Sequence, residues 1–481
     1  MADDRLSKFV KLMTTKISDS DLELVKLGES LGLDLFSLAD LRLSQEEEFT
    51  DKIRVKSLEL LEKEKDHELT ANDLFYAGSI DFMVSDEPEG KKFFLLETNG
   101  GSNRGLSILT VKQQAIMYDG YYRAIDQAIN SNKRGDDKIL VLVGVPIEDG
   151  LIHEKVIMLE YIRNRLKKKN RSVKFYNIDN FSSEFEVDVA ILIADYKQLS
   201  NNLSFSDDWV TIKEDARVSV LIGDGIARRL HDNEFARLIR EDFRQINSII
   251  VNPVFRVTDD KSLTYLASYY AKDILEKYNL KYLLFTKAYD EEDLVEKIKQ
   301  VLATYKRPFI IKPNGGSGGA GVIPIGPDED PNNIQRLIEQ SKDEFFKKFM
   351  KNRDPYPYTI QEMAQFSLID WMGGKHTFDI RIYMSQQEEG IITPIGGLAR
   401  IARGNYHGTL DKQEFVVNLS GFDGQIEVFR GRGISPENAD LLNLTLDDIA
   451  NVFSIGCALF ASIAKNYQKI MDFEDWDKII G

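Results

Sequence analysis

The sequence predicts an α/β protein built from several domains. Strand-like apolar runs at residues 138–145, 187–193 and 218–222 alternate with helical patterns, which indicates a parallel sheet with crossover helices. Two further apolar runs, residues 75–84 and 93–96, are joined by a turn-rich segment and predict an antiparallel hairpin. The chain has 481 residues, of which 43% are hydrophobic. A chain of this length is expected to hold roughly two to four domains.

The composition limits the classes of partner and compartment. The formal net charge is −16, with 62 Lys and Arg against 78 Asp and Glu, so the chain as a whole would repel nucleic acid and an anionic membrane surface. There is no apolar run of the length that spans a bilayer, about 18 residues, and no apolar signal sequence at the N-terminus. The single cysteine, Cys457, excludes an intramolecular disulfide framework. We therefore expect a cytoplasmic protein with no nucleic-acid partner and no membrane partner, and assembly as a homodimer stays open.

Changes of pattern divide the chain into four segments. Residues 1–69 have the pattern of charged amphipathic helices, and residues 70–135 hold the predicted hairpin and a following helix. Residues 136–250 carry the parallel-sheet pattern of a Rossmann-like domain. They lack a Gly-x-Gly-x-x-Gly turn after the first strand, so dinucleotide binding is not expected there. Residues 251–481 contain further helices and strands, including a helix predicted over residues 446–468.

A glycine-rich loop follows the apolar strand at residues 309–312. Residues 312–321 read Lys-Pro-Asn-Gly-Gly-Ser-Gly-Gly-Ala-Gly, with five glycines in the seven positions from Gly315. Such a loop leaves backbone N–H groups free to turn toward an anion, and Lys312 adds a positive charge nearby. No Gly-Lys-Ser/Thr sequence closes the loop, so it is not a Walker A motif. The pattern predicts a phosphate-binding loop, and a flexible surface turn is the alternative.

Three oxygen-bearing side chains lie on the predicted hairpin. Glu97 and Asn99 are two positions apart and share one face of a strand, and Asp81 on the partner strand can oppose them. Two carboxylates and an amide oxygen suit a magnesium ion that also holds phosphate oxygens. The flanking residues are apolar, and a buried charge without a partner is costly. We therefore predict a metal site, with an ordinary polar strand face as the alternative.

Several other polar residues could serve a site, although each has a plain structural alternative. Arg381 lies on an alternating strand with its side chain opposite the apolar face, and it would by default be a satisfied surface residue, as would Arg400. A substrate carboxylate could be held by Ser102, Asn103 and Arg104, for which a plain turn is the alternative. Tyr265, at helical spacing with Tyr269 and Tyr270, is expected to belong to the core.

In chain order these pieces resemble the ATP-grasp superfamily, and within it the glutathione synthetase-like carboxylate–amine ligases. Asp260-Lys261 at a helix start resembles the family's first ATP-binding lysine, and Lys312 with its loop resembles the second lysine and the mobile phosphate loop. Residues 361–363, Gln-Glu-Met, fall where the family has the hinge that receives adenine. Asp379-Ile-Arg381 and Leu398-Ala-Arg400 are similar to its phosphate- and acyl-phosphate-contacting positions, and Asn418-Leu-Ser-Gly421 resembles its small-residue turn.

The order of these parts resembles a circular permutation of the family's usual order. There, the Asp…Glu-x-Asn magnesium hairpin follows the last helix, whereas here Asp81, Glu97 and Asn99 precede the other motifs. The resemblance thus implies an α/β (α+β) protein with a circularly permuted ATP-grasp fold. It also implies an inserted Rossmann-like parallel-sheet domain and an N-terminal helical region, as in eukaryotic glutathione synthetases.

The resemblance implies an ADP-forming C–N ligase that joins a small-molecule or peptide carboxylate to an amine through an acyl phosphate, with ATP and Mg²⁺ as cofactors. The implied nucleotide contacts are Lys261, Lys312, Gly315, Gly316, Ser317, Gly318, Gly319, Gly321, Gln361, Glu362, Met363 and Asp379. The implied metal ligands are Asp81, Glu97 and Asn99, and the substrate contacts are Ser102, Asn103, Arg104 and Asn418. The catalytic set is Lys312, Arg381 and Arg400, with Arg400 stabilising the tetrahedral intermediate. Two alternatives remain, a kinase without an amine step and a nucleotide-binding regulator without turnover.

Overall fold

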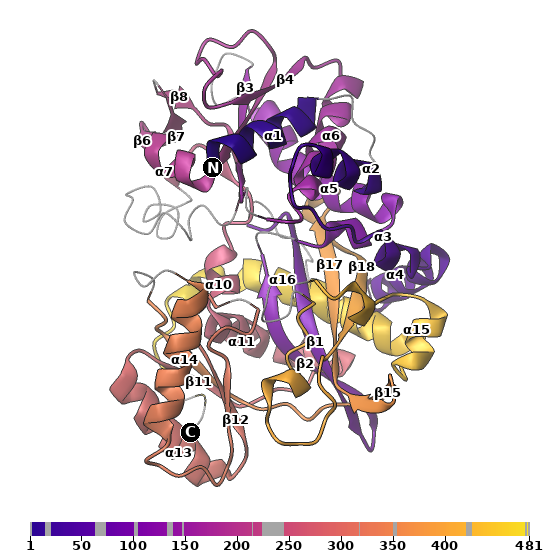
Figure 1. The fold of residues 1–481 in the computed structure, drawn as a ribbon, viewed down its shortest axis with the longest axis vertical. Coiled ribbons are helices and arrows are strands. Elements are labelled where there is room, and N and C mark those ends of the chain that lie inside the picture. Colours follow the sequence, from indigo (N-terminus) through magenta and orange to yellow (C-terminus); the bar gives the residue numbers. More distant parts are fainter. Residues whose placement is uncertain are drawn as a thin grey trace.

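The fold was analysed in a computed structural model of the chain. The structure describes residues 2–14, 21–62, 74–100, 104–131, 138–146, 149–213, 215–223, 245–316, 318–349, 354–419, 426–476 and 479. These residues form a mixed α/β arrangement. The parallel sheet, a small antiparallel sheet over residues 203–217 and the first helices of the chain lie at one end of the molecule, and the larger antiparallel sheets lie at the other (Figure 1).

The N-terminal helices pack against the parallel-sheet region. They are α1 (Ala2–Thr14), α2 (Asp21–Ser30), α3 (Ala39–Leu43) and α4 (Glu47–Glu62). The apolar face of α1, which includes Phe9 and Leu12, is buried in the same core as Val141 of the parallel sheet. Helix α4 instead contacts α16 (Leu446–Met471), so the N-terminal helices touch both ends of the molecule.

The predicted parallel sheet is confirmed. Its strands, in the order β10-β9-β3-β5-β4, are all parallel to their neighbours. They are β3 (Ile139–Val145), β4 (Val173–Asn177), β5 (Val189–Asp195), β9 (Val220–Ile222) and β10 (Ile249–Ile250). β3 and β5 are buried at every position, as expected for central strands covered on both faces. Two of the helices beside this sheet are α5 (Val111–Ser131) and α6 (His153–Lys168).

A large antiparallel sheet joins segments from both parts of the sequence. In the order β19-β18-β17-β1-β2, its strands are β19 (Gly431–Gly433), β18 (Ile392–Ile401), β17 (Phe378–Gln386), β1 (Ala77–Glu87) and β2 (Gly90–Asn99). The predicted hairpin is therefore present as β1 and β2. Its first strand pairs with β17, so that Asp81 lies opposite Glu97 on one side and opposite Arg381 on the other.

Helix α16 is a core element of this sheet region. Of the described helices, it is the one whose length and apolar composition would suit a membrane span, yet 78% of its apolar window is buried inside the protein. It packs against β17 and β18 as well as α4, and a Cβ added at Gly456 would lie 2.6 Å from Ile382. Cys457 is buried on this helix, and burial raises the pKa of its thiol. These contacts are those of a packed interior helix.

A smaller antiparallel sheet carries the glycine loop. Its order is β11-β14-β12-β13, with β11 (Phe285–Ala288), β14 (Tyr358–Glu362), β12 (Phe309–Lys312) and β13 (Ile323–Ile325). Helices α13 (Glu291–Tyr305) and α14 (Ile334–Lys348) share a separate apolar core with it. The glycine loop connects β12 to β13, next to α14.

The remaining elements connect these layers. The helix that begins at Lys261 is divided into α11 (Lys261–Tyr270), α12 (Lys272–Leu275) and the 3₁₀ turn η3 (Glu276–Tyr278). The other helices and turns are η1 (Leu106–Ile108), α7 (Tyr196–Asn202), α10 (Phe255–Asp259), η4 (Glu388–Gly390), η5 (Lys412–Glu414), η6 (Val428–Arg430) and α15 (Pro436–Leu441). The other strands are β6 (Leu203–Ser206), β7 (Trp209–Ile212), β8 (Ala216–Arg217), β15 (Ile369–Trp371) and β16 (Gly374–His376).

Candidate active site

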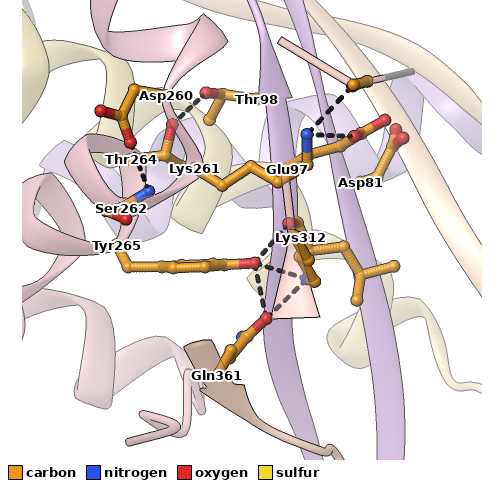
Figure 2. Close-up of polar contacts among 12 residues, drawn as sticks. Asp81, Glu97, Thr98, Asp260, Lys261, Ser262, Thr264, Tyr265, Lys312 and Gln361 are labelled. Carbon is orange, nitrogen blue, oxygen red and sulfur yellow. Dashed lines mark hydrogen bonds and ion pairs between the residues drawn. The ribbon is translucent and has the colours of Figure 1, made fainter. Parts of the chain in front are cut away.

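Residues from distant segments meet between the large and the small antiparallel sheets. Glu97 lies on β2, Lys261 begins α11, and the glycine loop follows β12. The Lys261 side chain extends toward the hairpin, with its Nζ 3.8 Å from Glu97 Oε2, and it also donates to the carbonyl oxygen of Gly316 at 3.1 Å (Figure 2). These contacts bring the hairpin and the glycine loop into one site.

The start of α11 is fixed by Asp260. Its side chain caps the helix by accepting from the backbone N–H groups of Ser262 and Leu263, at 2.9 and 3.4 Å. The second carboxylate oxygen of Asp260 accepts from Lys287 Nζ on β11 at 2.6 Å, in a largely buried ion pair. The capped helix and the ion pair hold Lys261 in the first turn, between the two sheets.

Lys312 is a buried cation of the site. It is 7% exposed, and its Nζ donates to Gln361 Oε1 at 2.5 Å and to the Tyr265 hydroxyl oxygen at 2.8 Å (Figure 2). Burial, together with the nearby charge of Lys261, lowers the pKa of Lys312 to about 7, and Glu97 only partly opposes this. A bound anion would reverse this shift because it favours the protonated ammonium.

Tyr265 has a role that its helical spacing did not predict. The side chain is buried as expected, but its hydroxyl oxygen lies 2.6 Å from the carbonyl oxygen of Leu96 on β2 and also accepts from Lys312. It thereby links the hairpin to the small sheet. A signal was present in the sequence, because Lys261 and Tyr265 are four positions apart and share a helix face.

The glycine loop adopts backbone conformations that favour glycine. Gly315, Gly318, Gly319 and Gly321 have φ values of 61°, 62°, 74° and 73°. A Cβ added at Gly318 would lie 2.4 Å from Lys348 Nζ and 2.7 Å from Asn418 Nδ2. Ser317 lies outside the described residues. The described part of the loop is therefore closely approached by nitrogen-bearing side chains from α14 and from the segment after η5.

Four charged residues form a row across the large sheet. Asp81, 1% exposed, accepts from Arg381 Nε at 2.6 Å and Nη2 at 2.7 Å, and from Arg400 Nη2 at 2.8 Å. Arg400 also pairs with Asp379, through Nε at 2.9 Å and through Nη2. The antiparallel register dictates these pairs, because Asp81 lies opposite Arg381 and Asp379 lies opposite Arg400.

The pKa values of the two carboxylates in this row are shifted in opposite directions, downward for Asp81 and upward for Asp379. Burial alone would raise the pKa of Asp81, but Arg381 and Arg400 outweigh it and hold this pKa well below its ordinary value. Burial raises the pKa of Asp379 to about 6, although Arg400 opposes the shift. With both carboxylates ionised the row is neutral overall, which makes its burial tolerable.

The predicted metal ligands fit a metal unequally. Both carboxylate oxygens of Asp81 accept from arginines, so the geometry gives Asp81 the role of an ion-pair partner, and its ligation of a metal stays a prediction. The Glu97 side chain is 32% exposed and faces the site. The Nδ2 of Asn99 is buried without a hydrogen-bond partner. Because Nδ2 is a donor, it suits an anion, and a metal would be bound by the Oδ1 of Asn99. The described residues contain no group of three His, Cys, Asp or Glu side chains that could hold a metal by itself. Glu97 and Asn99 therefore suit an ion that takes most of its ligands from phosphates and water.

The predicted adenine hinge is already hydrogen-bonded within the protein. The amide of Glu362 donates to Leu284 O at 2.7 Å, and the amide of Met363 donates to Pro308 O at 2.9 Å. The Glu362 carboxylate pairs with Arg307 at 2.6 Å. A narrow pocket with a volume of about 10 Å³, which is room for about one water molecule, lies beside this segment. It is lined by Leu95, Tyr265, Ser268, Leu280, Lys281, Tyr282, Leu283, Phe285 and Gln361.

The predicted substrate contacts are described only in part. Ser102 and Asn103 lie outside the described residues. Arg104 pairs with Asp149 at 2.5 Å, in the segment that follows β3, so this loop is tied to the parallel-sheet region. Asn418 approaches Gly318, and its carbonyl oxygen accepts from Arg430 at 2.7 Å. The sequence analysis missed several residues that the structure places at or beside the site, namely Tyr265, Lys287, Lys348 and Lys412.

Comparison with protein families gives one match. Residues 272–419 match the family model described as YheC/D-like ATP-grasp. The matched range runs from α12 to Leu419 and contains the small sheet, the glycine loop, Arg381 and Arg400. The predicted resemblance to the ATP-grasp superfamily is thus confirmed, and the mixed α/β arrangement is consistent with an ATP-grasp fold. Lys261 and the hairpin lie outside the matched range, and the circular permutation stays a prediction. A comparison with curated proteins gives no significant match.

Solved structures with detectable likeness are distant in sequence. A candidate gamma-glutamylcysteine synthetase from Methylobacillus flagellatus KT is 12% identical, with 88% of this chain and 96% of that chain covered and a TM-score of 0.49. A glutathione synthetase-like effector from Globodera pallida is 14% identical, with 76% and 81% covered and a TM-score of 0.39. D-alanyl-alanine synthetase A from Vibrio cholerae is 9% identical, with 54% and 90% covered and a TM-score of 0.26. These TM-scores are too low to assign an activity.

Proposed function

We propose that this protein is an ATP-dependent ligase that activates a small-molecule or peptide carboxylate as an acyl phosphate and joins it to an amine. The observation that carries this proposal is the convergence of Lys261, Lys312 and the glycine loop on Glu97 of the hairpin. Cations gather there although the chain as a whole has a net charge of −16. A local concentration of positive charge in an acidic protein suits a small anionic ligand.

In the proposed complex, the nucleotide lies between the two antiparallel sheets. The narrow pocket beside Gln361 is lined by apolar and aromatic side chains and would widen to receive a flat base. Lys312 lies next to it, because its Nζ donates to Gln361 Oε1. Lys261, Lys312 and the backbone N–H groups of residues 315–321 would bind the phosphates. The predicted hinge contacts of Glu362 and Met363 require their present backbone bonds to rearrange, and they stay part of the proposal.

Glu97 and Asn99 are the residues that would hold Mg²⁺. When bound, Mg²⁺ would neutralise charge on the phosphates during transfer. The half-buried carboxylate of Glu97, which faces the site, supports this assignment. Asn99 would contribute its Oδ1, and its buried Nδ2, which has no hydrogen-bond partner in the structure, would be left to donate to a phosphate oxygen. Asp81 would act indirectly, by orienting Arg381 and Arg400.

The proposed reaction has two steps. A carboxylate oxygen attacks the γ-phosphorus, the bond to the ADP oxygen breaks, and ADP leaves with its negative charge. The amine then attacks the acyl carbon, phosphate departs, and the amine loses a proton to solvent. Arg381 and Arg400 use Nε and Nη2 for their carboxylate partners, so Nη1 of each remains to donate to an oxyanion. The protein would thus act chiefly by positioning and by electrostatic stabilisation.

Hydroxylamine trapping tests the proposal. The purified chain would be incubated with Mg²⁺, ATP, hydroxylamine and pools of amino acids or short peptides as acids. A ligase should release ADP and phosphate and form a hydroxamate of the correct acid, detected by mass spectrometry. Glu97→Gln should abolish the product, because a neutral amide binds Mg²⁺ poorly beside phosphates. Glu89→Gln, at an exposed turn position of the same hairpin, is the matched control and should leave it intact.

The outcomes separate the alternatives. A phosphorylated hydroxyl product without any hydroxamate would identify a kinase. Nucleotide binding without ADP release, across all acid pools, would identify a non-catalytic regulator. Either result would overturn the ligase assignment. The acid and the amine would be named by the pool that responds.

A further inference from the structure

Lys348 stands at the last turn of α14, directly against the glycine loop. Its Nζ is the atom that a Cβ at Gly318 would meet first, at 2.4 Å, and Asn418 Nδ2 would be next at 2.7 Å. The ammonium and the amide therefore lie side by side over one point of the loop. Lys348 ends α14 and Asn418 follows η5, so both residues approach the loop from outside the small sheet.

The charges that act on Lys348 come from across the site. Burial lowers the pKa of Lys348, the charge of Arg104 lowers it further, and the charge of Glu97 raises it. The residue as a whole is nevertheless exposed. The groups that face it are the predicted metal ligand Glu97 and the predicted substrate residue Arg104.

The neighbouring cations are oriented by carboxylates of the protein. Lys261 lies 3.8 Å from Glu97, and Lys412 pairs with Glu344 while its Nζ is 3.5 Å from Gly319 O. Arg104 pairs with Asp149 at 2.5 Å. Such pairs place positive charge at fixed points around the loop.

We infer that Lys348 is a further phosphate-binding residue of this site, which contacts the terminal phosphoryl group of a bound nucleoside triphosphate. The inference deepens the proposed function and rests on it for the place of the nucleotide. Its geometric basis is the position of Nζ against Gly318, beside Nδ2 of Asn418. Lys348 would thus distinguish a triphosphate from a diphosphate, because the diphosphate lacks the group that it touches.

Equilibrium binding tests this inference without turnover. The probes are Mg²⁺ with the non-hydrolysable triphosphate AMP-PNP, and Mg²⁺ with ADP, each titrated calorimetrically into the full chain. Lys348→Met should weaken AMP-PNP binding by about tenfold, in the range of one charge-assisted contact, and leave ADP binding within twofold. Lys348→Arg should keep AMP-PNP binding within about threefold because it retains the charge. Lys347→Met, at the adjacent exposed position of the same helix turn, is the matched control and should change neither affinity.

Two outcomes would overturn the inference. The first is that Lys348→Met binds AMP-PNP as tightly as the wild type does. The second is an equal loss of affinity for AMP-PNP and ADP, which would mean that the residue merely supports the loop. Failure of the ligase proposal is a different result, namely no hydroxamate from a protein that still binds AMP-PNP. Melting temperatures of the variants, expected to lie close to that of the wild type, verify that each is folded.

Discussion

Replacing Asp81 with asparagine should destabilise the protein by about 3 kcal/mol, the lower end of the cost of breaking a buried ion pair. Asp81 is 1% exposed and accepts three hydrogen bonds from two guanidinium groups. Bonds of this charged type contribute about 1.5–3 kcal/mol each, which sets an upper bound well above the expected loss. The loss is smaller because Arg400 keeps its ion pair with Asp379 in the variant. The Arg381 side chain is 17% exposed and 4.0 Å from Glu97, so it can regain part of its hydration.

Urea unfolding of the metal-free protein at pH 7 measures this change. Two variants on the same hairpin serve as controls. Glu97→Gln should cost less than about 1 kcal/mol, because its side chain is 32% exposed and its ionic partners lie at 3.8 and 4.0 Å. Asp86→Asn, at an exposed position of β1, should cost equally little. The pKa of Asp81 is depressed in the folded state, so its contribution is complete above its unfolded pKa of about 4 and is lost as the pH falls below that value.

The opposite result would refute the structural role of Asp81. If Asp81 were a metal ligand, its neutralisation would stabilise the metal-free protein, because the repulsion between Asp81 and Glu97 would disappear. If Asp81→Asn were as stable as the wild type without metal, and also lost the Mg²⁺ dependence of nucleotide binding, Asp81 would be the metal ligand that its sequence position predicts.

Two further predictions concern the nucleotide site. The pKa of Lys312 is lowered to about 7, so most Lys312 is neutral at pH 8, and binding of Mg²⁺ with AMP-PNP should take up close to one proton. Calorimetry in two buffers of different ionisation enthalpy measures this uptake, which should vanish in Lys312→Met; equal heats for the wild type in both buffers would contradict it. Limited proteolysis of the free protein should cut near Gly318, and AMP-PNP with Mg²⁺ should suppress the cut as the loop closes over the phosphates. Cleavage at the same rate with and without nucleotide would count against a phosphate-binding loop.

Much of the fold could be predicted because the apolar patterns are strong. The runs that became β3 and β5 are buried at every position, and the run around Phe82 became the first strand of the hairpin. The long apolar helix α16 was also predicted at its place, and the structure shows a capping box at Thr445 at its start. Each of these patterns lies within a short stretch of consecutive residues, so it can be seen in a single sequence.

The candidate site was predicted less completely because its details depend on how strands that are far apart in the sequence pair with one another. Nothing near Asp81 in the sequence shows that Arg381 will lie opposite it, and this pairing gives the carboxylate an ionic partner in place of a metal. The hydroxyl of Tyr265 reaches Leu96 O, where the register of β1 and β2 shifts after Asp81 and Glu97, and such an irregularity is not visible in residue types. Lys348 ends an ordinary amphipathic helix, so its place beside the loop follows only from how α14 packs.

The pairing of β1 with β17 also constrains how the protein is made. Strand β1 emerges from the ribosome early, whereas β17 begins only at Phe378, so the inner edge of the hairpin has no partner while most of the chain is being synthesised. An exposed strand edge with apolar side chains readily pairs with other chains. Contacts between residues so far apart also slow folding, because the intervening chain must be closed before they form. Production in a cell therefore depends on protection of this edge during translation, and slower growth or added chaperones should raise the soluble yield.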